Sequence, residues 1–256
     1  MKLFIVTGVD VNHAKIAINC VARFHALGIA VKQKFPETFQ RIKSKALLKG
    51  LLNATVVQQI YSLIVNTVRH STTLLPYMPK LEAMIMNDSM KSLNQKDDSW
   101  STVAHGDFRL NNLMFHKNYL GIVDDVKMYD FPLFTYHSGL IDLPYFLNTA
   151  LDDYTYNEHF DDLIDYYYES FIETLNVMKC EIGMYTKQKF YEHLKDIMIA
   201  RFGASLILIK VSTSEIGKSN KGNTSIDTVL EDSSCDTKFC KKVIKVIKKY
   251  EQHGWW

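Results

Sequence analysis

Residues 105–112, His-Gly-Asp-Phe-Arg-Leu-Asn-Asn, and residues 129–132, Tyr-Asp-Phe-Pro, stand at the two ends of a short β pattern. Residues 101–104 precede the first stretch and have the composition of a short strand. Residues 113–116 and 122–129 are two further strand candidates, separated by an Asn-Tyr-Leu-Gly turn. The pattern predicts a small β-hairpin that carries both stretches at its root.

Three side chains in these stretches have the spacing that phosphoryl transfer requires. Asn112 follows Asp107 by five positions, and Asp130 follows it by 23. Phosphoryl transfer needs one carboxylate to orient the attacking hydroxyl and accept its proton, and oxygen ligands that hold Mg²⁺ against the phosphates. The spacing therefore offers Asp107 as a base and Asn112 and Asp130 as magnesium ligands.

This combination resembles the catalytic loop of the protein-kinase-like phosphotransferases, in the branch of the aminoglycoside phosphotransferases and choline kinases. It is most similar to the CHK kinase-like, or ecdysteroid kinase-like, family. The stretches that carry the resemblance are residues 105–107, 111–112, 130–132 and 142–147, together with 21–26 upstream. The similarity is specific from about residue 10 to residue 152, and Pro132 departs from the glutamine usual in the family.

The resemblance implies a role for each matching residue. Asp107 would be the catalytic base, and Asn112 and Asp130 would bind Mg²⁺. His105 would be a structural member of the loop, and Asp142 would anchor the loop by hydrogen bonds. The implied activity is transfer of phosphate from ATP to the hydroxyl of a small organic molecule, such as an ecdysteroid or a choline-like alcohol.

Arg109 has two interpretations. It lies two residues after the proposed base, where its guanidinium could contact the transferring phosphoryl group and offset negative charge, which would make it catalytic. It could equally be a loop arginine that holds a neighbouring carboxylate. The sequence leaves both open.

The family's ATP-binding lobe has a Gly-rich loop and a strand lysine before the hinge. Neither is recognisable in this sequence, whose first predicted helix matches the helix after the hinge. We therefore expect residues 1–256 to form a C-terminal lobe alone, with residues 100–150 as its motif core, and to have negligible turnover by itself. The alternative is an inactive lobe that serves as a binding or interaction module.

The remaining sequence predicts mostly helix around the small β region. Apolar residues recur at helical spacing over residues 10–34, after Asn53, from Pro79, and over 160–178, 190–202 and 239–250. Pro36 should end the first helix. The expected fold class is α+β and mostly helical, and the resemblance implies the C-terminal lobe of a protein-kinase-like fold.

Composition excludes several other classes of protein. Net charge is +2, but residues 237–253 carry +5, so the rest carries 2 − 5 = −3. This charge distribution is not that of a nucleic-acid-binding protein, and we expect the terminal segment to be a docked helix with its lysines outward.

The sequence has no run of about 18 apolar residues, so it predicts no membrane span. Four cysteines make no disulfide framework, so we expect four free thiols and a cytoplasmic protein.

Overall fold

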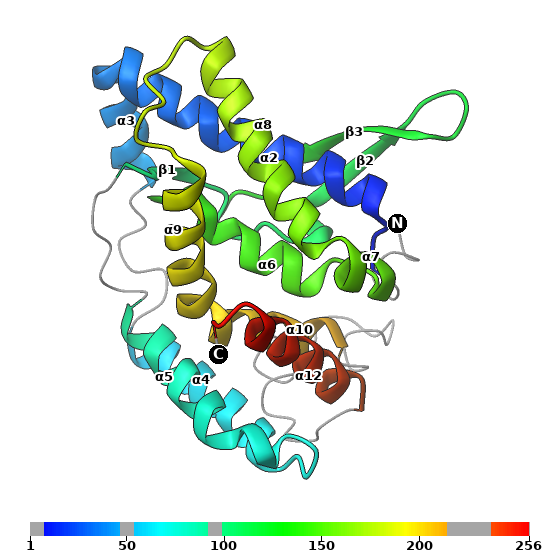
Figure 1. Cartoon of the computed structure of the whole chain (residues 1–256). Coiled ribbons are helices and arrows are strands. Elements are labelled where there is room, and N and C mark those ends of the chain that lie inside the picture. Colours follow the sequence, from blue (N-terminus) through cyan, green and yellow to red (C-terminus); the bar gives the residue numbers. More distant parts are fainter. Residues whose placement is uncertain (1–7, 47–53, 92–98, 214–236, 256) are drawn as a thin grey trace. The chain divides into compact units, whose positions relative to one another are not determined.

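The computed structural model describes residues 8–46, 54–91, 99–213 and 237–255 (Figure 1). The chain divides into two compact units. The first comprises residues 1–49 and 96–194, and the second comprises residues 50–95 and 195–256. All the candidate site residues lie in the first unit.

The first unit contains helices on both sides of the β region in the sequence. Its elements are α2 (Val11–Lys34), α3 (Pro36–Ala46), β1 (Ser101–Ala104), the 3₁₀ turn Leu110–Asn112, β2 (Leu113–Lys117), β3 (Val123–Met128), β4 (Thr135–Ser138), the 3₁₀ turn Gly139–Ile141, α6 (Asp142–Thr149), α7 (Asp153–Glu158), α8 (Phe160–Val177) and most of α9 (Lys187–Ala200).

Two separate antiparallel pairs of strands make up the β region. Strand β1 pairs with β4, with Ser101 opposite Ser138. Strand β2 pairs with β3, with Leu113 opposite Met128 at the root of the hairpin. The stretch 105–112 connects the two pairs, because it leaves β1 and enters β2.

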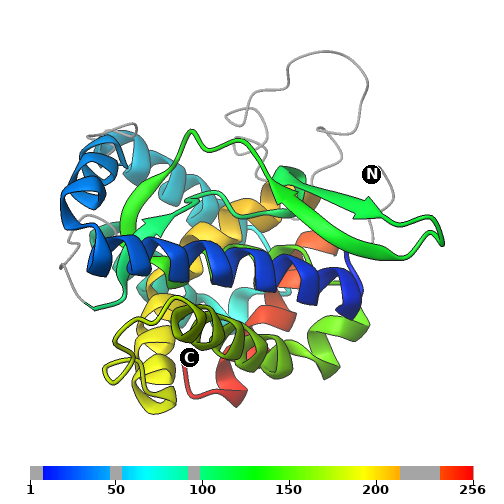
Figure 2. The ribbon, with the colours of Figure 1, turned by 90° about the horizontal axis from the view of Figure 1, so that it is seen from above.

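Helix α2 is the central element of the first unit. Asp10 caps its start by accepting a hydrogen bond from the backbone N–H of His13 (3.0 Å), and the helix ends at Lys34, just before Phe35 and Pro36. Pro36 then begins α3, since proline suits a first helical turn. Along α2, a stripe of small residues such as Ala14 and Ala17 is fully buried and packs on α8 (Figure 2).

By length and composition alone, α2 could cross a membrane, although polar residues interrupt its apolar run. In the structure its apolar face belongs to the core. His25 on that face is fully buried and bonded to the Asp142 carboxylate. These contacts are those of a buried helix of a packed domain.

The second unit is built from helices. They are α4 (Ala54–Arg69), the 3₁₀ turn Leu75–Tyr77, α5 (Met78–Lys91), the end of α9, α10 (Phe202–Thr213) and α12 (Thr237–Gln252). Helix α10 packs against α4, α5 and α12. Val243, Ile247 and Tyr250 of α12 are fully buried, whereas Lys241 and Lys248 are exposed, as a docked amphipathic helix requires. Lys249 is buried, so the prediction that the lysines face outward is wrong at that residue.

The prediction of a mostly helical α+β chain is confirmed, as are the helix over residues 10–34 and the β2–β3 hairpin. The pattern did not predict α3, α7, α10 or β4, and the helix expected over residues 190–202 ends at Ala200. The expectation of four free thiols is wrong at Cys240, which is disulfide-bonded, whereas Cys20 and Cys180 are free and Cys235 lies outside the described residues.

The cap of α2 generates a stability prediction. Burial opposes ionisation of Asp10, but its hydrogen bonds to His13 outweigh burial and lower the pKa of the carboxyl below 3.8. Because the folded pKa is depressed, the stabilisation is complete above the unfolded pKa and is lost as pH falls through the folded one. Asp10→Ala should lower the free energy of unfolding by about 1 kcal/mol at pH 7.

Urea unfolding of both proteins at a series of pH values measures this effect. The difference should persist down to about pH 4 and shrink below it. A difference that is unchanged at pH 2 to 3 would contradict the cap assignment.

Candidate active site

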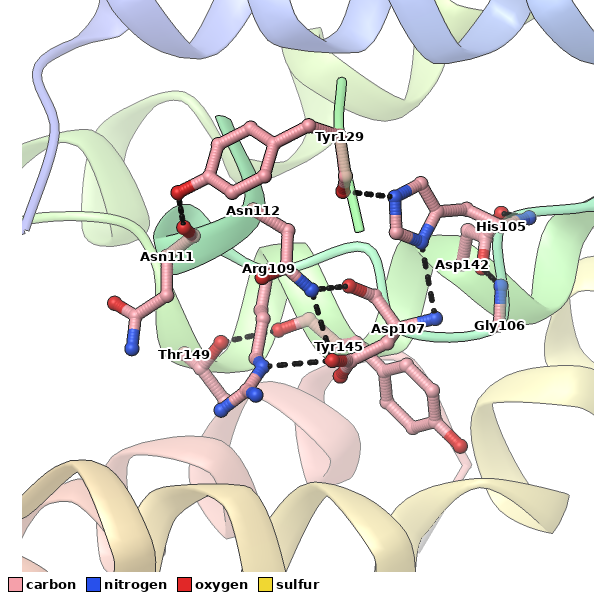
Figure 3. Close-up of polar contacts among 10 residues, drawn as sticks. All are labelled: His105, Gly106, Asp107, Arg109, Asn111, Asn112, Tyr129, Asp142, Tyr145 and Thr149. Carbon is pink, nitrogen blue, oxygen red and sulfur yellow. Dashed lines mark hydrogen bonds and ion pairs between the residues drawn. The ribbon is translucent and has the colours of Figure 1, made fainter. Parts of the chain in front are cut away.

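The loop that carries residues 105–107 is held by one buried carboxylate (Figure 3). Asp142, at the start of α6, is fully buried. Its Oδ2 accepts the backbone N–H of His105 (2.8 Å), and its Oδ1 accepts that of Gly106 (2.9 Å). The loop therefore takes its position from α6.

A second pair of side chains supports Asp142 from the opposite side. His25 of α2 donates from Nε2 to Asp142 Oδ2 (3.0 Å), and the Tyr167 hydroxyl of α8 donates to His25 Nδ1 (2.8 Å). Burial, and after it the Asp142 carboxylate, raise the pKa of Tyr167 well above its ordinary value. The Asp142 carboxylate can only accept, so Nε2 of His25 carries the hydrogen of that bond, and the Tyr167 hydroxyl, which keeps its proton, faces Nδ1 as its donor.

His105 connects the loop to the segment that follows β3, at the root of the hairpin. Its Nδ1 accepts the backbone N–H of Asp107 (3.3 Å), and its Nε2 donates to the carbonyl of Tyr129 (3.0 Å). The ring also packs against Phe131, with 4.3 Å between ring centroids. The fully buried imidazole of His105 thus joins the two stretches of the motif, residues 105–107 and 129–131.

Gly106 allows a close approach that no other residue permits. Its φ of +79° lies in the left-handed region, and a Cβ there would stand 2.1 Å from the carbonyl oxygen of Leu133. Leu133 belongs to the turn after Asp130, in which the Phe134 N–H bonds to the Phe131 carbonyl (3.1 Å) with Pro132 at the second position. Proline favours that position, so Pro132 stabilises the turn that lies against the loop.

Asp107 has one oxygen occupied and one available. Its Oδ2 accepts from Asn112 Nδ2 (2.8 Å) and from Arg109 Nε (3.0 Å). Asn112 Nδ2 also donates to the Asp107 carbonyl (2.9 Å), which fixes the amide and directs its Oδ1 away from Asp107. No hydrogen bond from the described residues reaches Asp107 Oδ1 or Asn112 Oδ1.

Arg109 forms an ion pair with the neighbouring Asp107. This is the contact expected of a loop arginine that holds a neighbouring carboxylate. Its side chain is 30% exposed, against 13% for Asp107. The pair uses Nε, and no hydrogen bond to a described residue uses the Nη groups. Contact with a phosphoryl group therefore remains compatible with the ion pair.

Asp130 is placed beside the loop by its neighbours. The Tyr129 N–H donates to the Asn112 carbonyl (3.1 Å), and the Tyr129 hydroxyl donates to the Asn111 carbonyl. Asp130 itself is exposed and has φ of +63°, a conformation that costs free energy at any residue other than glycine. No hydrogen bond or ion pair from a described residue occupies its carboxylate.

The structure thus brings Asp107, Arg109 and Asn112 into direct contact, joins His105 and Asp142 to the loop, and leaves Asp130 adjacent through its backbone. Sequence reasoning missed His25 and Tyr167. A histidine within the apolar stripe of a helix was the available signal, since a buried imidazole needs hydrogen-bond partners.

Among the described residues, no three His, Cys, Asp or Glu side chains are grouped to bind a metal ion. A nucleotide-bound Mg²⁺ needs only one or two protein oxygens, because phosphates and water complete its coordination. The amide oxygen of Asn112 and the carboxylate of Asp130 are donors of the kind that Mg²⁺ prefers. The residues present therefore fit that ion.

A family model of ecdysteroid kinase-like proteins matches residues 6–180, which include every residue of this site. The chain belongs to the ecdysteroid kinase-like family. Membership implies a kinase-like fold and indicates a kinase-like phosphotransferase. No curated protein matches this ecdysteroid kinase-like chain.

The close approach at Gly106 can be tested against a matched glycine. Gly121 also has positive φ (+75°), but nothing lies within 4 Å of its Cβ position. Gly121→Ala should therefore cost only the backbone strain, about 1–2 kcal/mol. Gly106→Ala adds a clash with backbone and should cost clearly more in urea unfolding followed by fluorescence of the buried Trp100. Equal losses would show that Leu133 does not press on the loop.

The buried carboxylate generates a larger effect. Asp142→Ala leaves three donors without an acceptor, the buried N–H of His105, the buried Nε2 of His25 and the part-buried N–H of Gly106, so we expect a loss of at least about 3 kcal/mol. Asp162→Ala is the control: this carboxylate is 65% exposed and pairs with His159, so its loss should cost about 1 kcal/mol or less. Similar losses in the two variants, measured by urea unfolding, would contradict the anchoring role of Asp142.

Proposed function

We propose that this protein transfers the γ-phosphoryl group of ATP, with Mg²⁺, to the hydroxyl of a small organic molecule such as an ecdysteroid or a choline-like alcohol. The observation that supports this best is the state of Asp107. One carboxylate oxygen is held by Arg109 and Asn112, while the other accepts no bond from the described residues. A base needs this combination of a fixed orientation and an open oxygen.

In the proposed reaction, the substrate hydroxyl donates its hydrogen bond to Asp107 Oδ1. The alcohol oxygen attacks the γ-phosphorus, the bond from that phosphorus to the bridging oxygen of ADP breaks, and the hydroxyl proton passes to Asp107. The chain's contribution is mostly positioning, because this chemistry requires little covalent help from protein.

Asn112 and Asp130 are the proposed magnesium ligands. When bound, Mg²⁺ neutralises charge on the phosphate oxygens. The two hydrogen bonds from Nδ2 orient Asn112 so that its Oδ1 is the atom left to bind the ion. Asp130, exposed and next to Tyr129, supplies the carboxylate from the other end of the hairpin.

Arg109 has a supporting role in the proposal. Its Nε neutralises the ground-state charge of Asp107, and its Nη groups lie on the same side chain, available to a phosphoryl oxygen. A guanidinium can serve both because its donors form a rigid planar fork.

The test is phosphoryl transfer from γ-labelled ATP to a panel of small alcohols, with product detected by mass. We expect slow, Mg²⁺-dependent transfer to at least one alcohol of the panel. Asp107→Asn and Asp130→Asn should each reduce it by at least ~10²-fold. Asparagine tolerates positive φ, so Asp130→Asn should leave the free energy of unfolding nearly unchanged.

Asp124→Asn is the matched control. Asp124 is an exposed carboxylate on the same hairpin, bonded to His116, and its loss should leave transfer unchanged. Absence of Mg²⁺-dependent transfer to every alcohol, or full transfer by Asp107→Asn, would overturn the proposal.

A further inference from the structure

Both chain neighbours of Asp107 are held against helix α6. The N–H of Gly106 donates to the Asp142 carboxylate at the start of α6 (2.9 Å). The ring of Phe108 packs on Phe146, one helical turn further along, with 5.2 Å between the ring centroids. The side of α6 that carries Asp142 and Phe146 therefore runs along the loop beside Asp107.

Two half-buried side chains continue this side of α6. Tyr145 and Thr149 follow Asp142 by three and seven positions, so they lie on the same side of the helix. The Thr149 hydroxyl donates to the Tyr145 carbonyl, so the donor of that side chain is used within the helix. Figure 3 shows both side chains on the side of the loop where Asp107 and Arg109 meet. We call Tyr145 and Thr149 the α6 wall.

The geometry of phosphoryl transfer assigns the two sides of Asp107 to the two substrates. The attacking and leaving oxygens lie roughly in line, on opposite sides of the phosphorus. The proposed magnesium ligands Asn112 and Asp130 stand at the root of the hairpin, which places the nucleotide on that side. Figure 3 shows Asn112 on one side of the Asp107 carboxylate and the Tyr145 ring on the other. The acceptor alcohol therefore approaches along the α6 wall.

The charges beside the α6 wall favour a neutral acceptor. Helix α6 has a single charged residue, Asp142, which is fully buried and bonded to the loop. Asp107 is already paired with the guanidinium of Arg109, which is 30% exposed. An ammonium group on the wall would gain the face of one tyrosine ring but meet that guanidinium as a like charge. An uncharged hydrocarbon body gains the ring contact without that repulsion.

We propose that Tyr145 determines acceptor specificity: the uncharged hydrocarbon body of the alcohol packs on the Tyr145 ring while its hydroxyl donates to Asp107 Oδ1. This inference rests on the proposed function and narrows it, because it selects a neutral alcohol over a choline-like cation. The aromatic ring supplies a large apolar contact area at a fixed position, which orients the alcohol toward the base.

The experiment is an NMR titration of the full chain with alcohols in the absence of nucleotide. Ecdysone, a neutral steroid alcohol, tests the ring contact, and choline is compared with neopentylcarbinol, its uncharged carbon isostere. Tyr145→Ala should weaken ecdysone binding at least ~10-fold, because apolar contact area is lost. Tyr145→Phe, which keeps the ring, should bind ecdysone within about twofold of the unaltered chain.

The charge argument has its own readout. Neopentylcarbinol should bind at least ~3-fold more tightly than choline, and added salt should narrow the difference. Arg109→Gln removes the like charge and leaves Asp107 unpaired, so it should reverse the preference toward choline. This variant tests the inference even if Tyr145→Ala fails to fold.

The matched control is Tyr154→Ala on α7, which removes a tyrosine ring that is 66% exposed in the same unit. It should bind ecdysone as the unaltered chain does. In the transfer assay, Tyr145→Ala should raise KM for the alcohol at least ~10-fold and leave KM for ATP unchanged, since the ring faces the acceptor side.

Three results would overturn the inference: no alcohol binding by the unaltered chain, equal ecdysone binding by a folded Tyr145→Ala, or tighter binding of choline than of neopentylcarbinol. The two proposals fail separately. Transfer that responds to Asp107→Asn but not to Tyr145→Ala would overturn only the role of Tyr145. Tyr145-dependent ecdysone binding without any transfer would overturn the phosphotransferase proposal and leave the α6 wall as a binding surface.

Discussion

The candidate site depends on the Asp142 carboxylate. A fully buried charge is costly unless it is paired or hydrogen-bonded, and this one accepts from two loop amides and from His25. The same bonds that compensate the buried charge fix the backbone of His105 and Gly106. The same hydrogen bonds therefore stabilise the fold and fix the geometry of the loop, and the side chains that make them come from helices α2, α6 and α8.

Each further part of the site is held by a contact with a part that Asp142 already positions. Asp142 holds the loop, His105 ties the loop to Tyr129, and the turn at Pro132 places Leu133 against Gly106. Asp107 and Asn112 come next and bond to each other. A site whose side chains are fixed before substrate arrives needs less reorganisation during reaction, and phosphoryl transfer gains most of its rate from such positioning.

Local pattern predicted much of this, and non-local contacts explain what it missed. The spacing of Asp107 and Asn112 lies within one loop, so their contact followed from the sequence. Strand β4 was missed because its partner β1 lies more than 30 residues earlier and only pairing defines it. His25 and Tyr167 lie on different helices, 142 positions apart, and helical periodicity assigns both simply to the core.

The central claim is that the two ends of the hairpin, at Asn112 and at Asp130, together hold a nucleotide-bound metal ion. Paramagnetic relaxation by Mn²⁺ in the presence of a non-hydrolysable ATP analogue measures this directly in NMR spectra of the isotope-labelled chain. The account predicts that the side-chain amide of Asn112 and the backbone amides of residues 129–131 broaden first, and that Asp130→Asn removes the effect. Broadening confined to amides near other carboxylates would contradict the account, as would broadening that Asp130→Asn leaves undiminished.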